Sequence, residues 1–234
     1  MTESIEIIHE DDSIIVVNKP NNILVYASYF ARNIKDDDLV TLLKEQTEHE
    51  LYPIHRLDRK TSGILLLAKE KEFVKGYQQQ FENNKVQKHY YAIVRGYCPP
   101  KGIIDTPTKN AETGKYKDAL TEYETLETIE LDIPVHPYDK SRYSLVKFTP
   151  KTGRMHQLRI HANKISHPIV GDYQYGDRFH NRMFEHEFKW NNMFLHASEL
   201  SIKQPNSGDS LILKSGFPAD WDKLFEKFNW QKPK

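Results

Sequence analysis

The sequence predicts an α+β fold in one domain, built around a mixed, mainly antiparallel β-sheet with flanking helices. Short runs rich in β-branched and aromatic residues, typical of strands, recur along the 234 residues. Helical periodicity or helix-start signals mark residues 36–48, 70–84 and 218–228. No repeat and no convincing boundary interrupts residues 1–234, so we expect a single domain with its core at about residues 5–213.

The first half of the chain alternates strands and helices. Residues 5–8 and 13–18 predict a β-hairpin, closed by turn residues at 18–22. The acids at 36–38 predict the N-terminal cap of a helix that runs to about Glu48. The chain then continues with an apolar strand at 64–68, an amphipathic helix at 70–84 and a strand at 86–96.

The second half is less regular. Proline and glycine at residues 97–117 predict loops and turns, and residues 116–131 one or two strands. A strand at 141–148 precedes a helix that starts after Gly153 and ends near Ile165. Residues 177–192 are expected to be irregular. A strand at 194–200, a hairpin turn at 206–209 and a final helix at 218–228 complete the chain.

The composition is that of an ordinary globular protein, with 38% hydrophobic and 28% charged residues. No apolar run approaches the roughly 20 residues of a membrane span, and the first residues lack signal-peptide features. The single Cys98 excludes an internal disulfide framework. We therefore expect the protein in a reducing cytoplasm.

Charge is unevenly distributed although the net charge is zero. Residues 1–50 carry 11 acidic and 4 basic side chains. Residues 140–164 carry seven basic side chains and no acidic ones. A local basic patch can bind a phosphate backbone whatever the net charge, although a solvated surface would explain it equally well.

One dense motif occupies residues 54–63, Ile-His-Arg-Leu-Asp-Arg-Lys-Thr-Ser-Gly. Asp58 lies between Arg56 and Arg59, and nearby positive charge favours an ionised carboxylate. Such a carboxylate can act as a nucleophile or a base, and the adjacent strand would hold it on a rigid scaffold. Taken alone, the cluster is more often a surface ion pair.

A second motif occupies residues 150–161, Pro-Lys-Thr-Gly-Arg-Met-His-Gln-Leu-Arg-Ile-His. Helical spacing of Lys151, His156 and Arg159 predicts a charged helix face, which by itself is usually solvated. No cysteine or carboxylate set with ligand spacing accompanies His156 and His161, so we expect no metal site.

The string from His55 to Lys69 resembles the active-site signature of the RluA-type pseudouridine synthases. Residues 88–92, Lys-His-Tyr-Tyr-Ala, resemble the family's Lys-x-Tyr-x-Ala element. Residues 152–161 are similar to its Thr-Gly-Arg-x-His-Gln-Leu/Ile-Arg-x-His element. The resemblance runs from about Ile5 to Leu213, which is nearly the whole chain.

The resemblance implies an isomerase that converts a uridine in RNA to pseudouridine without cofactor or metal. It implies three catalytic residues: Asp58, an active-site tyrosine at Tyr90 whose ring stacks on an unpaired base, and Arg159 paired with Asp58. The RNA contacts expected on the same basis are Arg56, Lys151, Arg154 and His156. Tyr91 would point to the opposite strand face and pack in the core.

Within the family, the sequence most resembles a tRNA-specific branch, through the hairpin that leads almost directly into the domain, residues 134–146 and the extension at 176–198. This implies action on uridine 65 of tRNA, on the T-arm side of the acceptor stem, by a monomer. The catalytic motif begins at His55, so we expect no N-terminal S4-type module. Met155 and residues 162–164 depart from common forms of the family at positions that bear on RNA contacts.

Three alternatives remain at this point. The nearest is an rRNA-directed enzyme of the same family. A catalytically inactive RNA-binding module is a second, although pure binding would not require Asp58. A carboxylate-based hydrolase such as a glycosidase is the third, but no second carboxylate stands out as a partner for Asp58.

Overall fold

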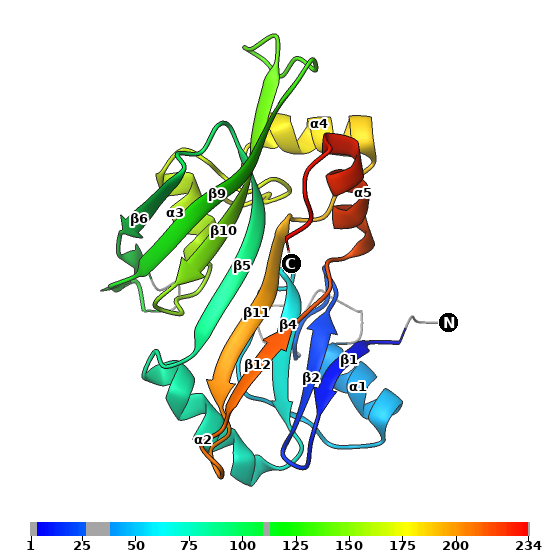
Figure 1. The fold of residues 1–234 in the computed structure, drawn as a ribbon, viewed down its shortest axis with the longest axis vertical. Helices are drawn as coiled ribbons and strands as arrows, with labels where there is room; N and C mark the ends of the chain where they lie inside the picture. The colour runs from blue at the N-terminus through cyan, green and yellow to red at the C-terminus, as the bar shows by residue number, and fades with distance from the viewer. Residues whose placement is uncertain (1–3, 27–37, 110–112, 234) are drawn as a thin grey trace. The chain divides into compact units, whose positions relative to one another are not determined.

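The computed structural model describes residues 4–26, 38–109 and 113–233 (Figure 1). Contacts divide the chain into two units. Unit 1 comprises Met1–Lys88 and Ala197–Gly216, and unit 2 comprises His89–His196 and Phe217–Lys234. The expected single domain stays a prediction.

Unit 1 is built on a sheet with strand order β1-β2-β4-β11-β12, and β3 lies beside β4. Its central strands are apolar and buried because β2 and β4 consist largely of isoleucine, valine and leucine. The β1/β2, β2/β4, β3/β4 and β11/β12 pairs are antiparallel. The strands are β1 Glu6–Glu10, β2 Ile14–Lys19, β3 Tyr52–Pro53, β4 Ser62–Ala68, β11 Leu195–Lys203 and β12 Ser210–Lys214; the first two residues of β11 belong to unit 2.

Two helices complete unit 1, α1 (Leu39–Thr47) and α2 (Lys71–Glu82). The predicted cap of α1 is partly confirmed: the Asp38 side chain accepts a hydrogen bond from the Thr41 backbone N–H, whereas residues 36 and 37 lie outside the described part. Helix α2 contributes Tyr77 to a core cluster with alternate residues of β2 and β4. The apolar face of the predicted amphipathic helix therefore packs in the core.

Unit 2 contains a four-stranded antiparallel sheet with order β5-β10-β9-β6. A separate two-stranded ribbon, β7 with β8, extends from it. The strands are β5 Gln87–Arg95, β6 Lys101–Asp105, β7 Thr108–Lys109, β8 Tyr116–Lys117, β9 Leu120–Leu131 and β10 Ser141–Pro150; the first two residues of β5 belong to unit 1.

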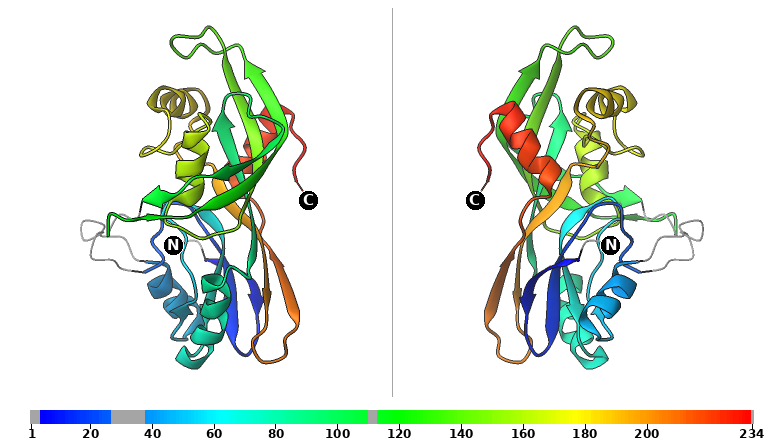
Figure 2. Two further views of the ribbon diagram at one scale, coloured as in Figure 1. Left: turned by 90° about the vertical axis from the view of Figure 1, so that its left-hand side faces the viewer. Right: turned by 90° about the vertical axis from the view of Figure 1, so that its right-hand side faces the viewer.

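Helices α3 (Gln157–Lys164) and α5 (Ala219–Phe228) cover opposite faces of this sheet (Figure 2). Neighbouring residues of a strand point to opposite faces, and β10 shows this directly. Leu145 packs in one core cluster with α5, while Val146 packs in the other with α3. Helix α4 (Arg178–Phe188) adds Met183 and Phe184 to the cluster of α5.

The predicted α+β class, with a mainly antiparallel sheet and flanking helices, is confirmed. Two local predictions are wrong. Residues 97–117 contain strand β6 and the β7/β8 ribbon, because pairing with β9 makes a strand of a segment that reads locally as turns. Residues 177–192 contain helix α4, which Asp177 caps by accepting hydrogen bonds from the backbone N–H groups of Phe179 and His180.

A further difference concerns α3, which begins only at Gln157. Lys151 and His156 precede the helix, so they share no helical face with Arg159. The turn at His156, whose φ is +55°, separates the motif into a loop and a helix.

Gly63→Ala is expected to destabilise unit 1 severely. A Cβ at Gly63 would lie 2.2 Å from the Ala197 carbonyl oxygen, and the φ of +110° disfavours any side chain. We expect the free energy of unfolding in urea to fall by about 3 kcal/mol or more. Gly208→Ala is the matched control, since its φ is +79° but nothing lies within 4 Å. It should cost only about 1–2 kcal/mol, and equal losses would contradict the packing argument.

Candidate active site

The loop that carries Asp58 connects β3 to β4 in unit 1. The backbone N–H of Ile54 donates to Leu66 at 3.0 Å, and that of Thr61 donates to the Asp58 carbonyl at 3.0 Å. The first bond ties the start of the loop to β4, which is buried along its whole length, and the second closes a turn within the loop just before that strand. Asp58 is half-buried and Arg56 is exposed, so the loop presents both side chains from a rigid base.

Lys19 holds the Asp58 loop in place through hydrogen bonds to backbone carbonyls. It is fully buried at the end of β2, and its Nζ donates to the carbonyls of Pro20, Ile23 and Arg59 at 2.8, 3.0 and 3.1 Å. Burial lowers the pKa of Lys19 to about 7, and the charge of Asp58 opposes this change. Lys19 therefore lies beside Asp58 and fixes the backbone next to it, and it loses its charge near neutral pH.

His55 fixes the loop on its other side. Its Nε2 accepts a hydrogen bond from the Leu66 backbone N–H at 3.1 Å, which requires the neutral ring with its proton on Nδ1. The imidazole stacks on Phe81 of α2, with 4.6 Å between ring centres. Burial, with the nearby charge of Lys88, lowers the pKa of His55 to about 3. The ring is therefore a neutral structural support at physiological pH.

The second motif lies in unit 2 and is organised by the buried amide of Gln157. Its Oε1 accepts from the Thr152 hydroxyl and from the Arg154 backbone N–H at 2.8 and 3.0 Å. Its Nε2 donates to the Leu120 carbonyl and the Thr121 hydroxyl. This amide holds residues 152–157 in a fixed turn ahead of α3.

The predicted RNA contacts in this turn differ in how free their charges are. Lys151 is exposed and forms an ion pair of 2.7 Å with Glu122. The Nε of Arg154 donates to the Asp118 carbonyl at 3.0 Å, which positions its guanidinium without neutralising it. The Nδ1 of His156 lies 3.0 Å from the Tyr175 hydroxyl, within hydrogen-bond distance.

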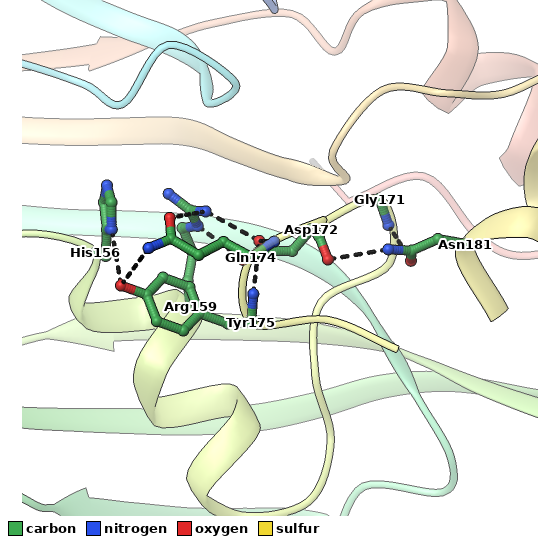
Figure 3. A network of polar contacts seen from close by, with 7 residues as sticks. All are labelled: His156, Arg159, Gly171, Asp172, Gln174, Tyr175 and Asn181. Atoms are coloured by element: carbon green, nitrogen blue, oxygen red, sulfur yellow. Dashed lines mark hydrogen bonds and ion pairs between the residues drawn. The ribbon is translucent and has the colours of Figure 1, made fainter. Parts of the chain in front are cut away.

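Arg159 is held by a carboxylate that the sequence pattern did not single out (Figure 3). Its Nε and Nη2 donate to the two carboxylate oxygens of Asp172 at 2.7 and 2.9 Å. Both side chains are buried, with exposed fractions of 8% and 1%. Burial works to raise the pKa of Asp172, but the Arg159 charge and backbone N–H donors outweigh it and hold the pKa below its usual value.

Asp172 is itself fixed by its surroundings (Figure 3). Its Oδ1 accepts from the backbone N–H groups of Gln174 and Tyr175 at 2.9 and 3.1 Å. The amide of Asn181 in α4 donates to the Asp172 carbonyl and accepts from the Gly171 N–H. The Arg159 guanidinium also lies over the Tyr175 ring, 5.0 Å from its centre. Arg159 is thus connected to α4 through one continuous polar network.

Tyr90 lies in β5, opposite Phe148 of β10, and packs half-buried against the core cluster of α3. Tyr91 points to the other face and contacts Phe217, with 5.4 Å between ring centres. The prediction that Tyr91 belongs to the core is therefore confirmed.

The predicted site residues fall into two groups. Unit 1 holds Asp58 and Arg56 on one loop. Unit 2 holds the remaining five residues, which are Tyr90, Lys151, Arg154, His156 and Arg159. The pairing of Asp58 with Arg159 stays a prediction.

Sequence reasoning missed three residues that position these groups: Lys19, Asp172 and Asn181. Lys19 and Asp172 lie in stretches with turn signals, and no periodicity links either one to its partner. Asn181 could have been found only with α4 recognised as a helix.

The described residues contain no group of three or more His, Cys, Asp or Glu side chains that could hold a metal ion. No helix among residues 4–26, 38–109 and 113–233 is long and apolar enough to cross a membrane.

Comparison with known proteins places these elements in context. A family described as RNA pseudouridylate synthase matches residues 13–164. Two relatives called tRNA pseudouridine synthase C, from Haemophilus influenzae and Vibrio cholerae, are 37% and 36% identical over 97% of this chain and 99% and 97% of their own. A third of that name, from Pectobacterium carotovorum, is 39% identical, but the chain spans only 63% of its length.

Solved structures agree in fold. The human proteins RNA Pseudouridylate Synthase Domain Containing 4 and RNA Pseudouridylate Synthase Domain Containing 1 superpose with TM-scores of 0.74 and 0.73. Each alignment covers 98% of this chain, and 95% and 96% of the human chains, at 24% and 23% identity.

Stability should fall in acid partly because of His55. A free imidazole has a pKa near 6.5, so the unfolded chain takes up a proton at this position as pH falls, whereas the folded chain does so only near pH 3. The stabilising contribution is complete above pH 6.5 and lost between pH 6.5 and 3, at most about 5 kcal/mol. Urea denaturation at pH 7 and pH 4 measures this loss.

His55→Gln is the matched control, because its amide oxygen can reach the position of Nε2 and accept the Leu66 N–H without titrating. The buried His161 and His180, whose pKa values burial also lowers, remain in both proteins. The variant should lose less stability between pH 7 and 4 than the wild type. Identical pH dependence in the two proteins would contradict the assignment.

Asp172→Asn should lower the free energy of unfolding by about 3 kcal/mol or more, because it leaves the Arg159 charge buried without its counterion. Asp177→Asn is the comparison variant. Asp177 pairs with the partly exposed Arg95 at 2.6 Å, and asparagine also caps helices well. Asp177→Asn should lower the free energy of unfolding by about 1 kcal/mol or less. A loss for Asp172→Asn no larger than that for Asp177→Asn would show that burial of the pair does not set its strength.

Proposed function

Because this chain belongs to the RNA pseudouridylate synthase family, we propose that it acts on tRNA and converts one uridine on the T-arm side of the acceptor stem to pseudouridine. The observation that carries the tRNA proposal is the similarity to proteins named tRNA pseudouridine synthase C, which extends over 97% of the chain at 36–37% identity. The extension at residues 176–198, which contains α4, lies within this similarity.

The reaction is an isomerisation. The C1′–N1 bond of uridine breaks, the uracil turns, and a C1′–C5 bond forms. The C5 hydrogen leaves as a proton and N1 regains one, so atoms and electrons balance without an oxidant or a transferred group. The task of the protein is therefore to expose the nucleotide, hold the base and supply one reactive carboxylate.

We assign the exposure step to Arg56 and Tyr90. A uridine in a stem must flip out of the helix, which costs a few kcal/mol. Arg56 projects from a tethered loop and is exposed, as expected for a group that contacts phosphate or fills the vacated space. The half-buried Tyr90 would stack on the flipped base.

We assign the chemical step to Asp58. It would attack the sugar or the base, or abstract a sugar proton, and Lys19 lies beside it in the same unit. Arg159 would orient the same carboxylate. Its bidentate bond to Asp172 supports this role, because the guanidinium is already fixed in direction before any substrate binds.

Asp58→Asn should abolish isomerisation while it leaves RNA binding largely intact. The amide keeps the shape of the carboxylate but lacks its charge and nucleophilicity. The measurement is release of tritium from C5-labelled uridine in an unmodified tRNA transcript, with binding followed separately. An active Asn variant would refute the assignment.

The same tritium-release assay distinguishes a tRNA substrate from an rRNA substrate. Release from tRNA by the wild type supports the tRNA proposal, and sequencing then locates the modified uridine. Release only from rRNA fragments would show an rRNA-directed enzyme. Binding without release from either RNA would indicate an inactive binding module.

A further inference from the structure

In the folded protein, several basic side chains of residues 140–164 form ion pairs with nearby carboxylates. Lys140 bonds Glu130 and Asp132, each at 2.9 Å, and Arg142 bonds Glu130 at 2.8 Å. These acids lie on or just beyond β9, which pairs with β10 along its length. With Lys151 also paired, a large part of the charge in this stretch is neutralised by neighbouring carboxylates.

Helix α4, in contrast, carries basic side chains that are not paired with any carboxylate among the described residues. Arg178 and Arg182 are exposed, lie one helical turn apart, and form no ion pair with any described acid. The Arg178 guanidinium lies 4.7 Å from the ring centre of Phe179, which is itself 43% exposed. This contact restrains Arg178 while its charge stays available. We call Arg178, Phe179 and Arg182 the α4 patch.

The α4 patch is rigidly attached to the candidate site. Asn181, within the same turn, bonds Asp172 and Gly171, and so connects the helix to Arg159 (Figure 3). Asp177 caps the helix and also binds Arg95 at 2.6 Å. A ligand on this patch would therefore be held at a defined position relative to Arg159.

The patch has a clear limit along the helix. The two acids of α4, Glu185 and Glu187, lie in its later half, and the Tyr173 hydroxyl donates to Glu185 at 3.4 Å. The free positive charge is thus confined to the first two turns, beside the polar network.

We propose that the α4 patch binds the phosphate backbone of the RNA stem that flanks the target uridine. The proposal rests on the proposed function, since it concerns a further contact to the same RNA. Two arginines at helical spacing can contact phosphates along one strand, and such contacts position a nucleic acid without reading its sequence. Unpaired cations release counterions on binding, whereas cations already paired with carboxylates gain little.

The test compares Arg178→Ala/Arg182→Ala with the control Lys140→Ala/Arg142→Ala. Both double variants lose two positive charges, so a general field effect changes both equally. Binding of an unmodified tRNA transcript is measured over a range of salt concentrations, and kcat and KM are measured by tritium release. Thermal unfolding verifies that each variant is folded.

The α4 variant should bind about tenfold more weakly near 0.1 M salt, and the slope of log K against log salt should decrease by about 2. Its KM should rise while kcat at saturating tRNA stays unchanged, because the patch touches no reacting atom. The control should change both quantities much less. The proposal would be overturned if the α4 variant kept the wild-type tRNA affinity and salt slope. It would also be overturned if both double variants lost tRNA affinity equally.

Failure of the proposed function would look different. In that case the wild type itself would release no tritium from tRNA. The comparison of the two double variants would then be repeated by binding alone on the RNA that is modified.

Discussion

The buried ion pair between Arg159 and Asp172 is the constraint on which the candidate site of unit 2 depends. Two charges can leave water only if their geometry is good and further hydrogen bonds satisfy their remaining donors and acceptors, and removal of either partner leaves a costly buried charge. The loop before α4 must therefore bring Asp172 to α3, and it does so through backbone donors at Gln174 and Tyr175. The position of α4 follows, because Asn181 bonds the same loop.

The Asp58 loop of unit 1 obeys the same principle with different groups. Lys19 and His55 are polar side chains placed in an apolar setting between β2, β4 and α2, and each bonds backbone groups that would otherwise lack partners there. Backbone bonds of this kind leave the loop little freedom. A reactive carboxylate on such a loop is held ready instead of being ordered when substrate arrives.

The surface that can bind a polyanion depends on where the charged side chains lie, because the net charge does not identify it. The net charge is zero, and the acids of β9 neutralise much of the basic stretch that follows in the sequence. The free cations of unit 2 include those of α4, a helix that the sequence pattern did not predict. The surface suited to a polyanion is therefore defined by which cations lack a neighbouring carboxylate, and that depends on strand pairing.

Local patterns were sufficient for β2, β4, α2 and α5, because their apolar periodicity coincides with burial in the folded chain. The motifs around Asp58 and Arg159 were also sufficient to identify the family. Strand β6 and helix α4 were missed, because β6 exists through its pairing with β9 and α4 begins at a cap within a polar segment. The burial of Lys19 and the bond between Arg159 and Asp172 were decided only by tertiary structure, since each joins residues whose sequence spacing carries no periodic signal.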